Sequence, residues 1–257
     1  MTVSSPASSG NSALLLGASG LVGSSLLRLL LEDPACGRVT ALVRRPLPIV
    51  HDKLRYVVAD FDRLDEHSSE FAVDWVFCCL GTTIRKAGSQ EAFARVDLDY
   101  PLAAARLSGD AGARSYHVIS AAQADSRSRI FYSRIKGRME EETAKLPLRE
   151  LHIYRPSLLL GDRQEFRLGE RVGSYVMRGL SLLFRGPLAL YRAIQAEDLA
   201  KAMLASALDK PTPALVSSPV SAPGSGSTSR GANTHSGTEL FQLAELYNSR
   251  MKELSRA

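Results

Sequence analysis

The chain has 257 residues, of which 45% are hydrophobic and 23% are charged. This composition is typical of a soluble globular protein and allows one large α/β domain or two small ones. The formal net charge is +5, but the 32 basic and 27 acidic residues are interleaved along the chain. The charge is therefore a weak argument for nucleic acid, and we expect no nucleic-acid partner.

The start of the chain and the cysteines exclude further classes of protein. Residues 1–12 contain no Lys or Arg, and glycines interrupt the apolar stretch that follows, so we expect neither a signal peptide nor an integral membrane segment. Cys78 and Cys79 are adjacent in an apolar run and Cys36 stands alone, which fits neither a disulfide framework nor a metal site. We therefore expect no metal and a reducing, cytoplasmic location.

Strand-like and helix-like segments alternate from the start of the chain. The strand-like segments are apolar almost throughout, which is typical of strands buried on both faces. The pattern therefore predicts a doubly wound parallel sheet, that is, an α/β fold of the Rossmann type. We expect strands at 13–18, 38–45, 54–61, 74–81, 115–122 and 150–161, and helices at 21–33, at 91–113 with a kink or a start at Pro101, and at 132–146.

Changes in composition predict how the chain is organised. We expect a disordered N-terminus at 1–11 and a single dinucleotide-binding domain at 12–209, whose loosely patterned segment 161–190 would form a lid over the substrate. Residues 210–236 are rich in Pro, Ser and Gly and predict a disordered insertion, because they cannot bury enough apolar surface to offset chain entropy. Leucines at helical spacing in 237–257 predict a final helix that docks on the domain.

Three glycines at the first strand-helix junction predict a dinucleotide site. Gly17, Gly20 and Gly23 lie directly after a strand and at the start of a helix. Glycines there permit a tight turn and let the backbone approach a pyrophosphate, whose charge then meets free N–H groups at the helix start. The alternative is a glycine-rich turn without a ligand, but the position at the first junction of an alternating chain favours dinucleotide binding.

Two arginines end the second predicted strand. Proteins of this fold that prefer NAD usually have an acidic residue there for the ribose hydroxyls. Arg44 and Arg45 take its place, and a guanidinium can pair with a 2′-phosphate in two-point geometry. We therefore expect NADP (as NADPH) rather than NAD, although two solvated arginines are the alternative. Asp60 and Phe61 follow the third strand and are placed to flank the adenine, unless Asp60 merely caps a turn.

A further cofactor contact is predicted after the fourth strand. In a doubly wound sheet the carboxyl ends of the strands face the ligand crevice. Leu80, Gly81 and Thr82 end the apolar run of this strand and would lie against the cofactor, although an ordinary strand exit is the alternative. We expect Cys78 and Cys79 to be inert core residues, because burial in apolar surroundings makes thiols unreactive.

Ser120, Tyr132 and Lys136 are the candidate catalytic residues. Ser120 ends the fifth strand, and Tyr132 and Lys136 begin the next helix, so all three can meet at the carboxyl edge of the sheet. An unperturbed phenol has a pKa of about 10. An ammonium about 4 Å away would favour the phenolate by roughly 4 kcal/mol at an effective dielectric constant of about 20, or about 3 pKa units.

The chemistry assigned to these three residues is acid-base catalysis. Ser120 would hydrogen-bond the substrate oxygen, Tyr132 would transfer the proton, and Lys136 would also hold the nicotinamide ribose. A Tyr-x-x-x-Lys pair by itself is usually a solvated helix face, so the assignment depends on the position of the pair in the predicted fold.

These residues resemble a known family, the atypical branch of the short-chain dehydrogenase/reductase superfamily, near the Tat-interacting oxidoreductase-like proteins and their fungal and bacterial relatives. The resemblance covers the chain from Ser12 to about Leu208. It is carried by the strings "LLLGASGLVG", "VTALVRRP", "VVADFDRLDE", "FCCLGTTIRKAGSQEAFARVDLDY", "ISAAQADSRSRIFYSRIKGRMEE" and "YRPSLLLGDRQEFRLGE".

The resemblance implies an NADP-dependent oxidoreductase and assigns roles residue by residue. It implies a catalytic Ser120, Tyr132 and Lys136, an adenosine-phosphate contact at Arg44, and a passage of Arg155 and Pro156 close to the nicotinamide. It also implies a cofactor loop made of Gly17, Ser19, Gly20, Leu21, Val22 and Gly23.

The chain departs from the pattern of that family at three places. Residues 120–124 read SAAQA where many relatives have Ser-Ser-x-Gly-Ala, and the 210–236 insertion is extra. The asparagine of the proton relay in better-studied short-chain enzymes has no counterpart, since the matching helix reads RVDLDY.

Two functions follow from the sequence. The first is hydride transfer between NADPH and a carbonyl or alcohol of unidentified structure. The second is an NADP(H)-binding regulatory or scaffold protein with little or no turnover, which would bind a protein partner through its C-terminal tail. A weaker third idea is contact of residues 174–194 with a membrane surface, but the same amphipathic pattern is expected of a helix that closes the substrate pocket.

Overall fold

The computed structural model describes residues 10–160, 193–209 and 232–256. Within these ranges, seven strands form one parallel sheet in the order β3-β2-β1-β4-β5-β6-β9. The first six follow the strand order of a doubly wound dinucleotide-binding sheet. The strands β1 to β3 extend to one side of β1 and β4 to β6 to the other, so the strand order reverses between β1 and β4. The predicted fold is confirmed. The strands are β1 (Asn11–Leu16), β2 (Cys36–Val43), β3 (Leu54–Val58), β4 (Trp75–Cys78), β5 (Ser115–Ile119), β6 (Leu151–Arg155) and β9 (Asn233–Ser236).

The central strands are apolar on both faces because helices cover both. In β1, Ala13 and Leu15 belong to one buried cluster, whereas Leu14 and Leu16 belong to another on the opposite face. This division follows from the two-residue alternation of a strand. A sheet buried in this way requires a crossover helix after nearly every strand.

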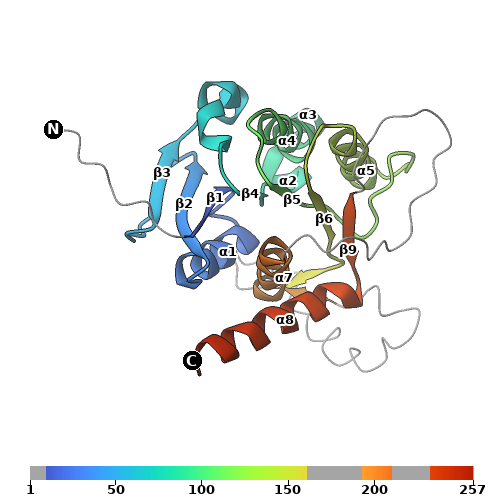
Figure 1. Cartoon of the computed structure of the whole chain (residues 1–257). Helices are drawn as coiled ribbons and strands as arrows, with labels where there is room; N and C mark the ends of the chain where they lie inside the picture. Colours follow the sequence, from blue (N-terminus) through green and yellow to red (C-terminus); the bar gives the residue numbers. More distant parts are fainter. Residues whose placement is uncertain (1–9, 161–192, 210–231, 257) are drawn as a thin grey trace.

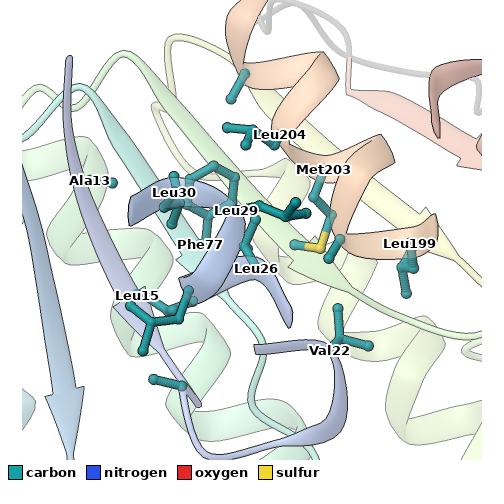
Figure 2. Close-up of a cluster of buried hydrophobic side chains, with 14 of the residues drawn as sticks. Ala13, Leu15, Val22, Leu26, Leu29, Leu30, Phe77, Leu199, Met203 and Leu204 are labelled. Atoms are coloured by element: carbon teal, nitrogen blue, oxygen red, sulfur yellow. The ribbon is translucent and has the colours of Figure 1, made fainter. Parts of the chain in front are cut away.

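Helices α1 (Leu21–Glu32), α7 (Ala196–Leu208) and α8 (Thr238–Leu254) lie on one face of the sheet (Figure 1). Their apolar residues pack with those of β1 and β4 in a single cluster. Figure 2 shows part of this cluster: leucines of α1 interdigitate with α7 above β1, and the labelled side chains are Ala13, Leu15, Val22, Leu26, Leu29, Leu30, Phe77, Leu199, Met203 and Leu204.

Helices and turns between Phe61 and Ala144 cover the opposite face (Figure 1). Instead of the single helix predicted at 91–113, α3, one π-helical turn and α4 follow one another. Pro101, at the start of α4, has no N–H to donate to the preceding turn, and the wider π turn lies directly before it. The elements are η1 (Phe61–Phe71), α2 (Ile84–Ala87), α3 (Gln90–Ala94), η2 (Arg95–Asp99), α4 (Tyr100–Asp110) and α5 (Phe131–Ala144).

The C-terminal part of the chain is joined to the sheet more closely than predicted. The prediction of disorder through residue 236 is wrong at its end, because Asn233–Ser236 form β9 and pair with β6. The following helix α8 docks as expected: Arg250 of α8 bonds the buried carboxylate of Asp33 at 2.7 Å, and Tyr247 is 3% exposed. Backbone hydrogen bonds to β6 supply the order that the side chains of this polar segment could not.

Other predicted boundaries differ or lie outside the described residues. Asn11, placed in the disordered N-terminus, begins β1 because its backbone and amide N–H groups both donate to the Ala35 carbonyl. β7 (Leu159–Leu160) and β8 (Ile194–Gln195) form a separate two-stranded parallel sheet. The expected lid at 161–190, the expected membrane-contact segment 174–194 for nearly all its length, and most of 210–236 fall outside the described ranges.

None of the helices described here is both long and apolar enough to cross a membrane.

Candidate functional site

The glycine-rich turn between β1 and α1 has the geometry of a close-approach loop. Gly17 has a positive φ of 84°, and a Cβ there would lie 2.6 Å from the Cys79 carbonyl oxygen. A Cβ on Gly23 would lie 2.1 Å from the Gly17 carbonyl oxygen. Only glycine fits either position without a backbone shift, so the turn packs closely against the backbone at the end of β4.

The start of α1 offers donors rather than side chains to such a ligand. Gly20 is the N-cap and its N–H donates to the Gly17 carbonyl at 2.9 Å. Ser19 is exposed, Leu21 is partly buried and Val22 belongs to the core. The first N–H groups of α1 therefore face the loop with the positive end of the helix dipole, which is suited to a phosphate.

Arg44 and Arg45 are exposed directly after β2. No ion pair joins either guanidinium to another described residue. This end of β2 lies next to the end of β1, because the two strands pair in register from Ser12 to Leu16. Both cations are therefore available on the side of the glycine loop.

The residues after β3 take structural positions. Asp60 accepts a hydrogen bond from the Asp62 N–H at 3.0 Å, which is the turn-capping role named as the alternative. The ring of Phe61 is 7% exposed and lies 5.7 Å from that of Tyr100. Asp60 is exposed after β3, whereas Phe61 is engaged in the core.

The loop after β4 is tied to a residue that the sequence analysis did not identify as functional. The Thr82 N–H donates to Oδ2 of Asp97 at 2.9 Å. Gly81 lies above the same carboxylate, since a Cβ on it would be 3.6 Å from Asp97 Oδ1. Leu80 is partly buried. The segment predicted to contact the cofactor thus has its position set by η2.

Ser120 follows β5 and is 3% exposed. Its N–H donates to the Tyr154 carbonyl at 2.7 Å, but its hydroxyl has no hydrogen-bond partner among the described residues. Pro156, after β6, lies beside this segment, because its carbonyl accepts the Ala122 N–H at 3.0 Å. A buried hydroxyl without a partner is costly, so Ser120 is suited to bind a polar atom of a ligand.

Lys136 is buried at the junction of three elements. Its Nζ lies 2.8 Å from Oδ1 of Asp97 in η2 and donates to the Ile119 carbonyl of β5 at 3.2 Å. Burial opposes the charge, but the attraction of Asp97 and the hydrogen bond with it raise the pKa of the Lys136 ammonium above its usual value. Lys136 is therefore a fixed cation that bonds the carbonyl of Ile119, the residue before Ser120.

Tyr132 lies one turn before Lys136 on α5 and is 39% exposed, with its ring 5.8 Å from that of Phe93. The predicted depression of its pKa is wrong. Partial burial raises the pKa of the Tyr132 phenol, Lys136 lowers it, and Asp97 raises it again, so the net direction is upward. The prediction failed because it counted the lysine charge and omitted the burial of the phenol and, as a smaller cause, the Asp97 carboxylate.

Arg155 ends β6, but its guanidinium is engaged on α5. Its Nε lies 2.9 Å and 3.1 Å from the two carboxylate oxygens of Glu140, and its Nη2 also bonds Oε2 of Glu140. The two-point pair fixes the orientation of the guanidinium. The backbone of Arg155 and Pro156 keeps the predicted place at the carboxyl edge, beside Ser120.

Asp97 is the site residue that sequence reasoning missed. The segment RVDLDY was considered only for the asparagine that it lacks. A usable signal was present: Asp97 follows the apolar Phe93 by four residues and precedes the apolar Leu98, which places a carboxylate on the buried side of a helix. A buried carboxylate requires a partner, and the only buried cation nearby in the described ranges is Lys136.

The chain matches a family described as the NAD dependent epimerase/dehydratase family, over residues 13–177. Two relatives are similar to this chain over about two thirds of its length. Protein HTATIP2 of Rattus norvegicus is 40% identical over 163 residues, which cover 62% of this chain and 67% of that protein. The mitochondrial protein FMP52 of Eremothecium gossypii is 33% identical over 174 residues, which cover 68% of this chain and 77% of that protein.

Solved structures of the same fold have low sequence identity. MoeE5 in complex with UDP-glucose and NAD has a TM-score of 0.61 at 18% identity, covering 91% of this chain and 81% of that chain. A UDP-glucose 4-epimerase of Thermotoga maritima has a TM-score of 0.59 at 14% identity, covering 93% of this chain and 82% of that chain. Both share the α/β architecture described above.

The relatives correct the expected location. Several FMP52 proteins that are 31% to 34% identical to this chain are named as mitochondrial proteins. The prediction of a cytoplasmic location is contradicted by these relatives. It was drawn from cysteine usage, which reports only a reducing environment and does not distinguish one reducing compartment from another.

Proposed function

Since the chain belongs to the NAD dependent epimerase/dehydratase family and its relatives include HTATIP2, we propose that it is an NADP-dependent oxidoreductase that reduces a carbonyl to an alcohol. The observation that carries this proposal is the buried, unpartnered hydroxyl of Ser120 beside the fixed ammonium of Lys136. A buried hydroxyl without a partner gains a hydrogen bond when a ligand oxygen lies beside it.

The chain holds the dinucleotide through its backbone and two cations. The compressed turn at Gly17 and Gly23 fits a pyrophosphate, because any side chain there would fill the space that the backbone needs. Arg44 and Arg45 pair with the 2′-phosphate that distinguishes NADP from NAD. When bound, the reduced nicotinamide supplies the hydride.

Three side chains take part in the transfer of the proton. The Ser120 hydroxyl donates a hydrogen bond to the substrate carbonyl oxygen, and Tyr132 gives its phenolic proton to the same oxygen as the carbon gains the hydride. The product is the alcohol, and the tyrosinate recovers its proton from solvent. Lys136 stabilises the tyrosinate during the step, because its ammonium is held one helical turn away.

The protonated form of Tyr132 supports its assigned role as the acid in carbonyl reduction. Partial burial and Asp97 hold the pKa of the Tyr132 phenol above its usual value of 10.0, so the residue is protonated at neutral pH. A protonated phenol is an acid. It serves carbonyl reduction directly, whereas alcohol oxidation would first require its proton to leave.

The experiment compares NADPH consumption with a panel of aldehydes and ketones in the wild type and in Tyr132→Phe. We expect the variant to bind NADPH as tightly as the wild type and to lose activity by at least about 100-fold, the range of a missing general acid. Tyr56→Phe is the matched control, since it removes the same atom from β3, where the hydroxyl only bonds the Ile49 carbonyl.

Two results would contradict the proposal. An unchanged rate in Tyr132→Phe would overturn the assigned mechanism. NADPH binding without consumption by any carbonyl of the panel would instead favour an NADP(H)-binding regulatory protein.

A further inference from the structure

Asp97 connects three parts of the candidate site that are far apart in the sequence. One carboxylate oxygen lies 2.8 Å from Nζ of Lys136, and the other accepts the Thr82 N–H at 2.9 Å. The Lys136 ammonium in turn donates to the Ile119 carbonyl, next to Ser120. Through Asp97, the loop after β4, the end of β5 and the start of α5 are held in one arrangement.

The Asp97–Lys136 pair is shielded from water. The side chains of Lys136 and Asp97 are 4% and 2% exposed. Solvent therefore screens neither charge, and each depends on the other for compensation. A carboxylate at the surface would compensate a neighbouring cation less fully, because water and salt would screen the attraction between the two charges.

The charge balance reaches Tyr132. Lys136 and Asp97 are the charged groups that act on the phenol, one from α5 and the other from η2. From β4, Cys78 lies beneath Lys136, but its thiol stays protonated because burial raises its pKa. Ser120 of the adjoining β5 end is uncharged. The cation one turn from the phenol is thus matched by a single anion on a neighbouring helix.

We propose that Asp97 is a positioning residue of this site: it fixes Lys136 and the loop after β4 together and offsets part of the lysine charge. Lys136 can then stabilise the tyrosinate during the reaction without drawing the proton from Tyr132 beforehand. This inference rests on the proposed function, and it states how the site keeps its general acid loaded with a proton at neutral pH. Asp97 contacts no reacting atom in this scheme and acts through Lys136.

The test is a titration of Tyr132, followed by the ultraviolet absorbance of its phenolate, with the same titration of Tyr132→Phe subtracted to remove the other tyrosines. In Asp97→Asn the carboxylate charge is lost while the size of the side chain is kept. We expect the midpoint of Tyr132 to fall by at least about one pH unit, as for a phenol beside an uncompensated ammonium. An unchanged or higher midpoint would overturn the proposal.

A conservative variant and a double variant test whether the midpoint shifts because of the lost charge or because of misfolding. Asp97→Glu keeps the charge and should return the midpoint to near the wild-type value. The double variant Asp97→Asn with Lys136→Gln removes both charges and leaves a neutral pair that can be buried. Its midpoint should stay within about half a pH unit of the wild type, and a larger shift would show that Asp97 does not balance Lys136.

The outcome is independent of the search for a substrate, because the titration uses the protein alone. A lowered midpoint in Asp97→Asn together with no carbonyl reduction would leave the inference about Asp97 standing and the proposed function refuted. Carbonyl reduction together with an unshifted midpoint would do the reverse. In an active protein, the high-pH limb of the rate profile should move to lower pH in Asp97→Asn.

Discussion

Two buried polar clusters lie on opposite faces of the sheet and are built on opposite principles. The first is the charged pair of Lys136 and Asp97, next to the unpartnered hydroxyl of Ser120. The second, here called the histidine row, consists of His117, His152 and His235 on β5, β6 and β9. The first cluster holds a pair of opposite charges, whereas the second consists of imidazoles that stack on one another and hydrogen-bond neighbouring side chains.

The histidine row is a stack that crosses three strands. The rings of His117 and His152 are 4.5 Å apart, and those of His152 and His235 are 5.3 Å apart. His117 bonds the Tyr154 hydroxyl at 2.9 Å and the Ser115 hydroxyl at 2.8 Å. His152 bonds His235 at 3.0 Å, and His235 bonds Glu239 at 2.8 Å. The row thus ties β9 and the start of α8 to the central sheet.

The difference shows how a buried ionisable group is tolerated in this chain. Where a carboxylate is placed against it, as at Lys136, the group keeps its charge. Where stacked imidazoles surround it, the group is kept neutral: burial, and the other two histidines of the row, hold the pKa of His117 well below its usual value of 6.5. Lys136 thus keeps its charge at the edge of the sheet where chemistry is proposed, whereas His117 is kept uncharged in the row that ties α8 to the sheet.

The largest effect is expected from separating the charged pair. Lys136→Gln leaves the buried Asp97 carboxylate without its cation, which should lower the free energy of unfolding by roughly 3 to 5 kcal/mol. The double variant Asp97→Asn with Lys136→Gln should recover most of this loss, because no buried charge is left. Urea unfolding at neutral pH measures both. Equal destabilisation in the single and double variants would show that the pair contributes shape rather than charge compensation.

An intermediate effect is expected from acid, acting on the histidine row. The pKa values of His117 and His152 are lowered by burial in the folded state, so the unfolded chain binds more protons below pH 6.5 and stability falls as the pH decreases from there. Arg114 also opposes the protonation of His117, whereas Glu150 favours that of His152. For His117, the free energy of unfolding should fall by roughly 1 to 2 kcal/mol between about pH 6.5 and pH 5.

The measurement is the free energy of unfolding at a series of pH values in the wild type and in His117→Gln. The variant should be less stable at neutral pH but should lose less on acidification. His51→Gln changes an exposed histidine outside the row and should keep the wild-type pH dependence. Identical pH dependence in His117→Gln and the wild type would mean that the row does not carry the effect.

The smallest effect is expected from changing the exposed arginines after β2, which are proposed to contact the cofactor. Arg44→Ala should weaken NADPH binding about tenfold, the value of one charge-assisted contact in water, and should leave NADH binding nearly unchanged. Arg38→Ala is the matched control, because Arg38 is exposed at the other end of the same strand. Fluorescence titration measures each affinity, and tighter binding of NADH by the wild type would overturn the assignment of Arg44.

The sequence predicted the sheet and the position of most candidate residues because both follow from local patterns. Gly17 and Gly23 were placed by their spacing after an apolar strand, and their close approach to Cys79 and to each other agrees with that prediction. Tyr132 and Lys136 were placed on one helix start, and they lie there. Their catalytic role, and that of Ser120, stays a prediction until the titrations and assays are done.

The tertiary structure decided what depends on contacts between distant segments. β9 is a strand only because β6 offers it a free edge, so no property of its own polar sequence predicted it. The pKa of Tyr132 is raised first by burial and also by Asp97, which belongs to another helix. A local pattern fixes which side chains share a face, but burial and electrostatic pairing depend on every segment that packs there. For that reason, only the folded chain determines the charge state of the site.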